Sequence, residues 1–143
     1  MAISNNKFVY EVVDMAAAAK TRKEKIELLR KYESWPLKDI LRGSFDEVVQ
    51  WNLPGGKVPY EPAEARSAPN TLSRQHKQFK YFVKGGPGDQ MPAIKRETMF
   101  VRLVESIHPR DAELVCSMIN KKTPAQGITK KLVQEAFPDL IKK

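Results

Sequence analysis

The sequence predicts an all-α domain of six to eight short helices. Apolar residues recur at the three- and four-residue spacing of amphipathic helices, and capping residues return about every dozen positions. No run alternates apolar and polar residues over the length of a strand. With 143 residues, 41% of them hydrophobic, the chain can bury a core of its own. We therefore expect residues 1–143 to form one compact domain, in which 1–52 and 71–143 can form sub-lobes joined by a loop.

Two helices are predicted before residue 34. The first has an apolar stripe that runs over residues 8–16, with Val12 and Val13 at its centre. The second begins at Thr21, because Glu24 follows at the spacing of a capping box and apolar residues come next.

The third and fourth predicted helices follow directly. Ser34 is the N-cap of the third helix, Pro36 lies in its first turn, and Gly43 ends it. Ser44 and Glu47 then repeat the capping-box spacing, which predicts a separate helix over the segment SFDEVVQW.

Residues 53–70 change in character and predict a long loop. The segment LPGGKVPYEPAEARSAPN contains four prolines and two glycines, which disfavour a helix or a central strand. Tyr60 lies between two of the prolines and would anchor the loop to the core.

A basic helix is predicted next, from Thr71 as N-cap to about Lys84. Its apolar face contains Phe79 and Phe82. At α-helical spacing, its other face carries Arg74, Lys77, Tyr81 and Lys84. The segment GGPGD ends the helix. It does not match a phosphate-binding loop, because Lys84 precedes the glycines and Asp89 follows them.

Three helices complete the predicted fold. One runs from about Pro92 to Ile107, and the next begins at Pro109. Thr129 caps the last helix and Pro138 ends it.

The net charge of +8 is concentrated in residues 71–102, which hold seven basic and two acidic side chains. Such a stripe can pair with successive phosphates of DNA or RNA, and a tyrosine can stack on a base. An equally simple interpretation is a solvated helix face. The residues expected to contact nucleic acid are Arg74, Lys77, Lys80, Tyr81, Lys84, Lys95, Arg96, Arg102, Lys130 and Lys131.

Lys130 and Lys131 belong to this set because they begin the last helix after a turn, as in a helix–turn–helix. That turn is longer than the usual three or four residues, which favours a helical hairpin that closes the core.

Large aromatic residues give an alternative, a protein-docking surface made by Trp35, Trp51 and Tyr60 together with the proline-rich loop 53–70. The simpler alternative is that these side chains belong to the core.

No catalytic, metal or cofactor site is predicted. His76 and His108 lie far apart in the sequence, and neither stands at metal-ligand spacing with Cys116. No nucleophile–base pattern is visible, so we expect a protein without enzymatic activity. A single cysteine suits a reducing compartment. No apolar run reaches the roughly 20 residues of a membrane span.

Four segments resemble a family of small proteins of unknown function encoded by T-even-like myoviruses, especially those that infect marine cyanobacteria. They are LKDILRGSFDEVVQWNLPGGKVPYEP, QFKYFVKGGPGD, AIKRETMFVRLVESIHP and GITKKLVQEAFPDL. The resemblance implies a phage protein that acts in the cytoplasm of a bacterial host or in the virion. It implies no mechanism, and leaves two expected functions: nucleic-acid binding, or docking to a host or phage protein complex.

Overall fold

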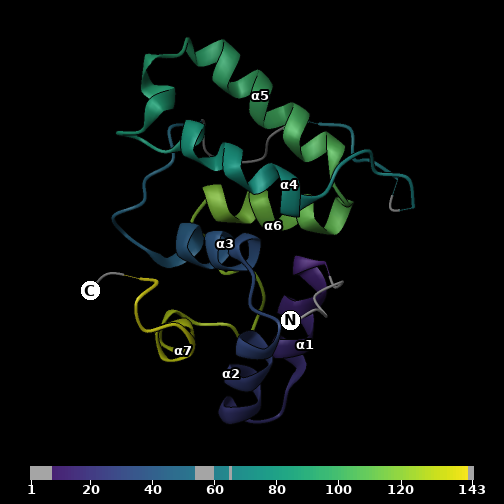
Figure 1. Cartoon of the computed structure of the whole chain (residues 1–143), viewed down its shortest axis with the longest axis vertical. Coiled ribbons are helices and arrows are strands. Elements are labelled where there is room, and N and C mark those ends of the chain that lie inside the picture. Colours follow the sequence, from purple (N-terminus) through teal and green to yellow (C-terminus); the bar gives the residue numbers. More distant parts are fainter. Residues whose placement is uncertain (1–7, 54–59, 65, 142–143) are drawn as a thin grey trace.

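The computed structural model describes residues 8–53, 60–64 and 66–141, and it confirms the all-α class (Figure 1). Within these residues the regular elements are helices, and an isolated antiparallel bridge joins Trp51 to Val83. In chain order the helices are α1 (Val9–Ala18), α2 (Arg22–Lys31), α3 (Trp35–Phe45), α4 (Leu72–Gln75), the 3₁₀ helices η1 (His76–Phe82) and η2 (Pro87–Gln90), α5 (Ala93–Ser106), α6 (Pro109–Ile119) and α7 (Lys130–Ala136).

Helix starts follow the predicted N-caps, because each capping oxygen accepts a backbone N–H that the helix leaves unpaired. The acceptor–donor pairs are Thr21 with Glu24 at 3.2 Å, Ser34 with Leu37 at 3.3 Å, Thr71 with Arg74 at 3.3 Å and Thr129 with Leu132 at 3.2 Å.

The predicted break between a third and a fourth helix at Gly43 and Ser44 is wrong. Helix α3 runs through both residues to Phe45, and Ser44 Oγ donates a hydrogen bond to the Ile40 carbonyl within the helix. Gly43 is a packing residue instead. A Cβ atom at this position would lie 2.5 Å from the Trp51 ring and 2.6 Å from Met118 Sδ. Close approach of α3 to its neighbours therefore explains this glycine.

The end of α3 is held by a side chain from the other half of the sequence. Lys121 Nζ donates to the carbonyls of Gly43 at 2.9 Å and Asp46 at 2.7 Å. These contacts satisfy carbonyls that the end of a helix leaves free.

Residues 71–84 do not form one α-helix as predicted, because α4 gives way to the 3₁₀ helix η1 at His76. A 3₁₀ helix has three residues per turn, so every third side chain shares a face. His76, Phe79 and Phe82 therefore point inward together, and both phenylalanines are buried.

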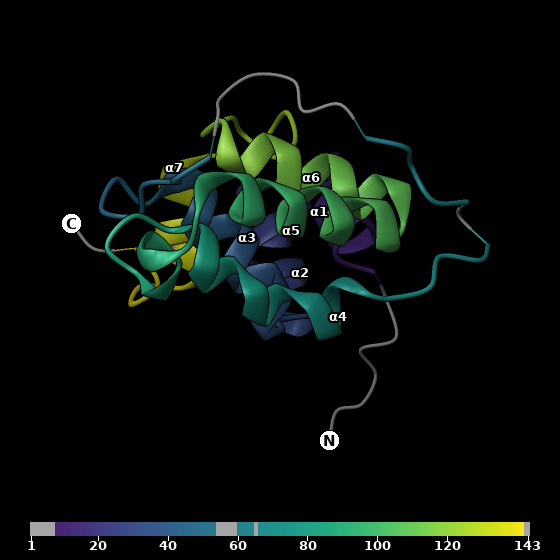
Figure 2. The ribbon, with the colours of Figure 1, turned by 90° about the horizontal axis from the view of Figure 1, so that it is seen from above.

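The core is shared by both halves of the chain. Helix α6 packs against α1, α3 and α5, and it runs beside α5 (Figure 2). Helix α2 packs against α7. Buried residues from 9–41 and from 72–141 form one cluster, so the two sub-lobes considered from the sequence have a common core. Figure 1 places α5 and α7 towards opposite ends of the long axis.

The predicted loop 53–70 is non-helical wherever it is described, while residues 54–59 and 65 lie outside the described part. Tyr60 packs against the core as expected. The Asn70 N–H donates to the Ser106 carbonyl at 2.8 Å, which joins the end of the loop to the end of α5. Among the helices described, none has the length and apolar character needed to cross a bilayer.

Candidate functional site

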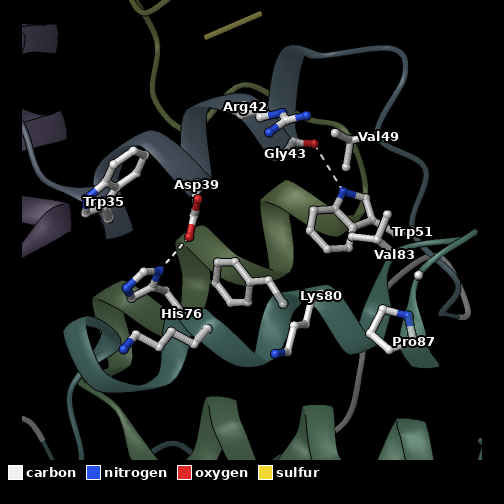
Figure 3. A pocket seen from close by; sticks show the side chains of 13 residues that line it. Trp35, Asp39, Arg42, Gly43, Val49, Trp51, His76, Lys80, Val83 and Pro87 are labelled. Carbon is white, nitrogen blue, oxygen red and sulfur yellow. Dashed lines mark hydrogen bonds and ion pairs between the residues drawn. The ribbon is translucent and has the colours of Figure 1, made fainter.

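An open pocket of about 540 Å³ lies between α3 and the segment formed by η1 and η2 (Figure 3). This volume is in the range of pockets that take small ligands. Its lining consists of Trp35, Asp39, Arg42, Gly43, Val49, Trp51, His76, Lys77, Phe79, Lys80, Val83, Gly86 and Pro87.

Helix α3 provides one wall through Trp35, Asp39 and Arg42. These residues are separated by four and then three positions, so they share one helix face. Trp35 is 69% exposed, although large aromatic residues are usually mostly buried. Arg42 Nε lies 3.5 Å from the buried Asp46 carboxylate, and about half of the Arg42 side chain remains exposed.

The 3₁₀ helix η1 provides the opposite wall. Lys77 and Lys80 are three residues apart, and the 3₁₀ repeat therefore places both on the face that lines the pocket. Both lysines are exposed. Lys80 Nζ lies 5.3 Å from the centre of the Tyr81 ring.

A histidine–aspartate pair crosses the pocket from η1 to α3. His76 Nδ1 and Asp39 Oδ2 are 2.5 Å apart, and Figure 3 shows the two side chains pointing at each other. When the imidazole is neutral, Nδ1–H donates to the carboxylate and Nε2 is left as an acceptor. A carboxylate that orients an imidazole in this way also occurs in general-base catalysis. The pocket lining includes no serine, threonine or cysteine among the described residues, so the pair has no nucleophile to activate there.

Trp51 stands at the end of the pocket away from Trp35 (Figure 3). Its indole N–H donates to the Gly43 carbonyl at 3.1 Å, and its ring meets Phe79 edge-on with centroids 6.2 Å apart. The indole N–H is therefore already paired. Backbone hydrogen bonds from Asn52 to Phe82 and from Lys84 to Gln50 hold this end of the pocket together.

Arg96 is not an exposed cation, and we remove it from the predicted phosphate contacts. Only 8% of the residue is exposed. Its guanidinium donates to the carbonyls of Asn52 at 2.8 Å, Gly88 at 3.1 Å and Met91 at 3.0 Å. Arg96 joins α5 to the segments beside Trp51 and Pro87. It therefore stabilises the pocket wall but does not line the pocket.

Four other predicted cations, Arg74, Lys84, Lys95 and Arg102, are exposed but do not line the pocket. Lys95 and Arg102 are seven residues apart and share the outward face of α5.

Lys130 and Lys131 are not brought together with the 71–102 cations, because α7 and α5 lie towards opposite ends of the molecule (Figure 1). Lys130 Nζ lies 3.7 Å from Glu47, and Lys131 is exposed. The structure therefore separates the predicted cations into two groups.

Neither predicted tyrosine lines the pocket. Tyr81 is half-buried against the core, and the three-residue repeat of η1 places it on a different face from Lys77 and Lys80. Tyr60 lies beside Cys116, where burial raises the pKa of Tyr60 to about 12 and also raises the pKa of the Cys116 thiol. The predicted docking set is thus divided: Trp35 and Trp51 share the pocket, and Tyr60 lies elsewhere.

His108 has a structural role at the start of α6. Its Nδ1 accepts the Arg110 N–H at 3.1 Å, which caps α6, and its ring stacks on Tyr10 with centroids 4.6 Å apart. Over the described part of the chain, no three or more His, Cys, Asp or Glu side chains are grouped closely enough to hold a metal ion.

Sequence reasoning missed Asp39, Arg42 and the placement of His76. One signal was present, because Trp35, Asp39 and Arg42 repeat at helical spacing within a segment already predicted to be helical. The opposite wall, formed by η1, had no such signal in the sequence. Its geometry depends on a 3₁₀ helix, whose three-residue period the α-helical assignment obscured.

Comparison with curated proteins gives no match. A family model described as a family of unknown function (DUF6433) matches residues 12–124, which include both walls of the pocket and exclude α7. Because this match extends over most of the sequence, the chain belongs to the DUF6433 family of unknown function.

Proposed function

We propose that this protein binds nucleic acid, without catalysing a reaction, through the pocket between α3 and η1 and the exposed cations around it. The observation that carries the proposal is the exposed Trp35 at a pocket that Lys77 and Lys80 also line. Cations that pair with phosphates and an aromatic ring that stacks on bases are the two features that nucleic-acid grooves combine.

The charges of the pocket favour a polyanion. Its lining contains three cations, Arg42, Lys77 and Lys80, against the single carboxylate of Asp39, which His76 contacts. Arg74 and Lys84 extend the positive charge along the chain on either side of η1. Affinity for DNA or RNA would then fall steeply as salt rises, because each phosphate contact releases condensed counterions.

The double substitution Lys77→Glu with Lys80→Glu tests the proposal. Fluorescence anisotropy with labelled DNA and RNA is expected to show a loss of affinity of at least about 10-fold, together with a shallower dependence on salt. The change of Arg74→Glu with Lys77→Glu is expected to act in the same direction. All three positions involved, Arg74, Lys77 and Lys80, are exposed, so the fold should persist.

Lys130→Glu with Lys131→Glu is the matched control, because it changes the net charge equally on α7 and neither lysine lines the pocket. This control is expected to bind nearly as tightly as the natural protein. Equal losses in the two double variants would show that only the total charge matters, and unchanged binding in the pocket variant would refute the proposal.

We propose the cytoplasm of an infected bacterium as the location of this function, with the virion as the alternative, because the resemblance to myovirus proteins implies these two settings. A small basic accessory protein that acts on phage or host nucleic acid suits both settings.

The second candidate function is docking to a host or phage protein complex. It is favoured by the same exposed Trp35, because aromatic residues anchor protein interfaces. Trp51, which the sequence predicted to dock together with the loop 53–70, donates its indole N–H within the fold and lines the pocket. Capture experiments from host lysate, with and without nuclease, separate the two functions. Partners lost on nuclease treatment indicate nucleic acid, and a defined complex that survives it indicates docking.

A further inference from the structure

We infer that the ligand is single-stranded nucleic acid and that Trp35 stacks on an unpaired base at the pocket. This inference rests on the proposed function and names its ligand class. Tyr81, the stacking residue expected from the sequence, is half-buried, whereas Trp35 is 69% exposed.

One side of the Trp35 ring is in contact with a lysine. Lys38 Nζ lies 5.0 Å from the centre of its ring, at cation–π distance. Lys38 lines a second, smaller hollow of about 310 Å³ that also includes Trp35, and it does not line the main pocket. Because Lys38 lines the smaller hollow and not the main pocket, we assign its ammonium group to the side of Trp35 away from the main pocket. The side that faces the pocket remains for a base.

Hydrogen-bonding groups lie next to this stacking position. Asp39 is one helical turn from Trp35 on the same face of α3, and its carboxylate meets the His76 imidazole. Figure 3 shows this pair at the same end of the pocket as Trp35. An unpaired base presents its Watson–Crick edge to such groups, while in a paired base that edge is already occupied.

The shape of the site also favours a single strand over a duplex. Phosphates can reach Lys77 and Lys80 at the opposite wall while a base lies against Trp35. Bases in a duplex are stacked and paired inside the helix, so only their edges reach a protein surface. A single strand can turn a base outward into a pocket of about 540 Å³.

The test uses the full chain and three labelled probes of about ten nucleotides: oligothymidylate, a duplex, and an abasic strand with the same backbone. Trp35→Ala is expected to weaken binding of oligothymidylate about tenfold and to leave the duplex and abasic strand nearly unchanged. An oligouridylate arm distinguishes RNA from DNA, and a similar loss in Trp35→Ala supports the inference for whichever strand binds more tightly.

Two variants accompany Trp35→Ala. Trp35→Phe keeps an aromatic face and is expected to retain most of the affinity. Ile94→Ala removes another large apolar side chain, 78% exposed on α5, and is expected to change nothing. Thermal unfolding of each variant checks that the fold is intact.

The outcomes separate this inference from the function on which it rests. If the natural protein binds the abasic strand as tightly as oligothymidylate, or if Trp35→Ala weakens all three probes alike, the stacking role is overturned while nucleic-acid binding stands. If none of the probes binds, the proposed function itself fails.

Discussion

At the scale of single residues, Asp111 and Arg96 show two different consequences of burying a charged group. Arg96 donates to three carbonyl groups, which replace the water that burial removes. Asp111 is 1% exposed and accepts the Tyr10 N–H at 2.9 Å. Burial raises the pKa of Asp111 from 3.8 to about 6, and the Tyr10 hydrogen bond only partly opposes this. The ionised form of Asp111 is therefore a cost to the folded state near neutral pH.

Asp111→Asn is expected to stabilise the protein at pH 8. Because the pKa of Asp111 is higher in the folded state, folding favours the protonated acid, and the ionised acid lowers stability fully above about pH 6. Two pKa units correspond to about 3 kcal/mol at most, and we expect about 1–2 kcal/mol because the new amide N–H groups need partners.

Urea unfolding at several pH values checks this prediction. The advantage of Asp111→Asn should shrink as the pH falls from about 6 to about 4, where natural Asp111 becomes protonated in both states. Glu27→Gln, at an exposed position on α2, is the control and should show no such trend. A gain of equal size at pH 4 and pH 8 would contradict the explanation.

At the scale of elements, the pocket wall depends on how the segment 76–91 is fixed to its surroundings. The Trp51–Val83 bridge holds its middle, and Arg96 holds Gly88 and Met91. Asp89 closes the turn between the two 3₁₀ helices by accepting the Gly85 N–H at 2.8 Å. Since 3₁₀ helices have poorer hydrogen-bond geometry than α-helices, these tertiary contacts are what keep the lysine-bearing wall in place.

Arg96→Met is expected to lower the free energy of unfolding by about 2–4 kcal/mol, because one buried and two part-buried carbonyls lose their donor. Hydrogen exchange should also speed up at the amides of Asn52 and Lys84, which form the bridge beside Arg96. Arg102→Met, on the same helix but exposed, is the matched control. If both variants unfold alike, Arg96 does not hold the wall.

At the scale of the whole molecule, the first and last thirds of the sequence close one core. Arg30 donates to the carbonyls of Glu135 and Ala136 at the end of α7, and α2 packs on that helix. Arg22 and Glu135 add an exposed ion pair at 2.7 Å. Separation in sequence between α2 and α7 therefore does not correspond to separation in space.

A fragment that contains only residues 71–143 is expected not to fold cooperatively. Its apolar surfaces on α6 and α7 would lose α3 and α2, which cover them in the full chain. The full chain should unfold in one transition, as small domains with a single core usually do. Circular dichroism during thermal unfolding, with full-length protein as the control, checks both statements. A fragment with a sharp transition of its own would show that 71–143 is an independent lobe.

The helical class and the first residues of most helices could be predicted from the amino-acid sequence. These features depend on neighbouring residues, such as Thr21 with Glu24 or Thr129 with Leu132, and short-range patterns report them directly. The positive charge of residues 71–102 was also visible, because charge is a property of composition.

Which basic side chains of residues 71–102 are exposed, and which residues lie beside them, depends on tertiary packing. Arg96 has the same sequence signature as its neighbour Lys95, but it is buried against carbonyls that come from residues as distant as Asn52. Gly43 looked like a helix stop because glycine often is one, and the approach of Trp51 and Met118 gives the actual reason for it. The pocket itself joins α3 to a 3₁₀ segment more than thirty residues away. Its geometry follows from long-range packing, and local spacing carries no information about such contacts.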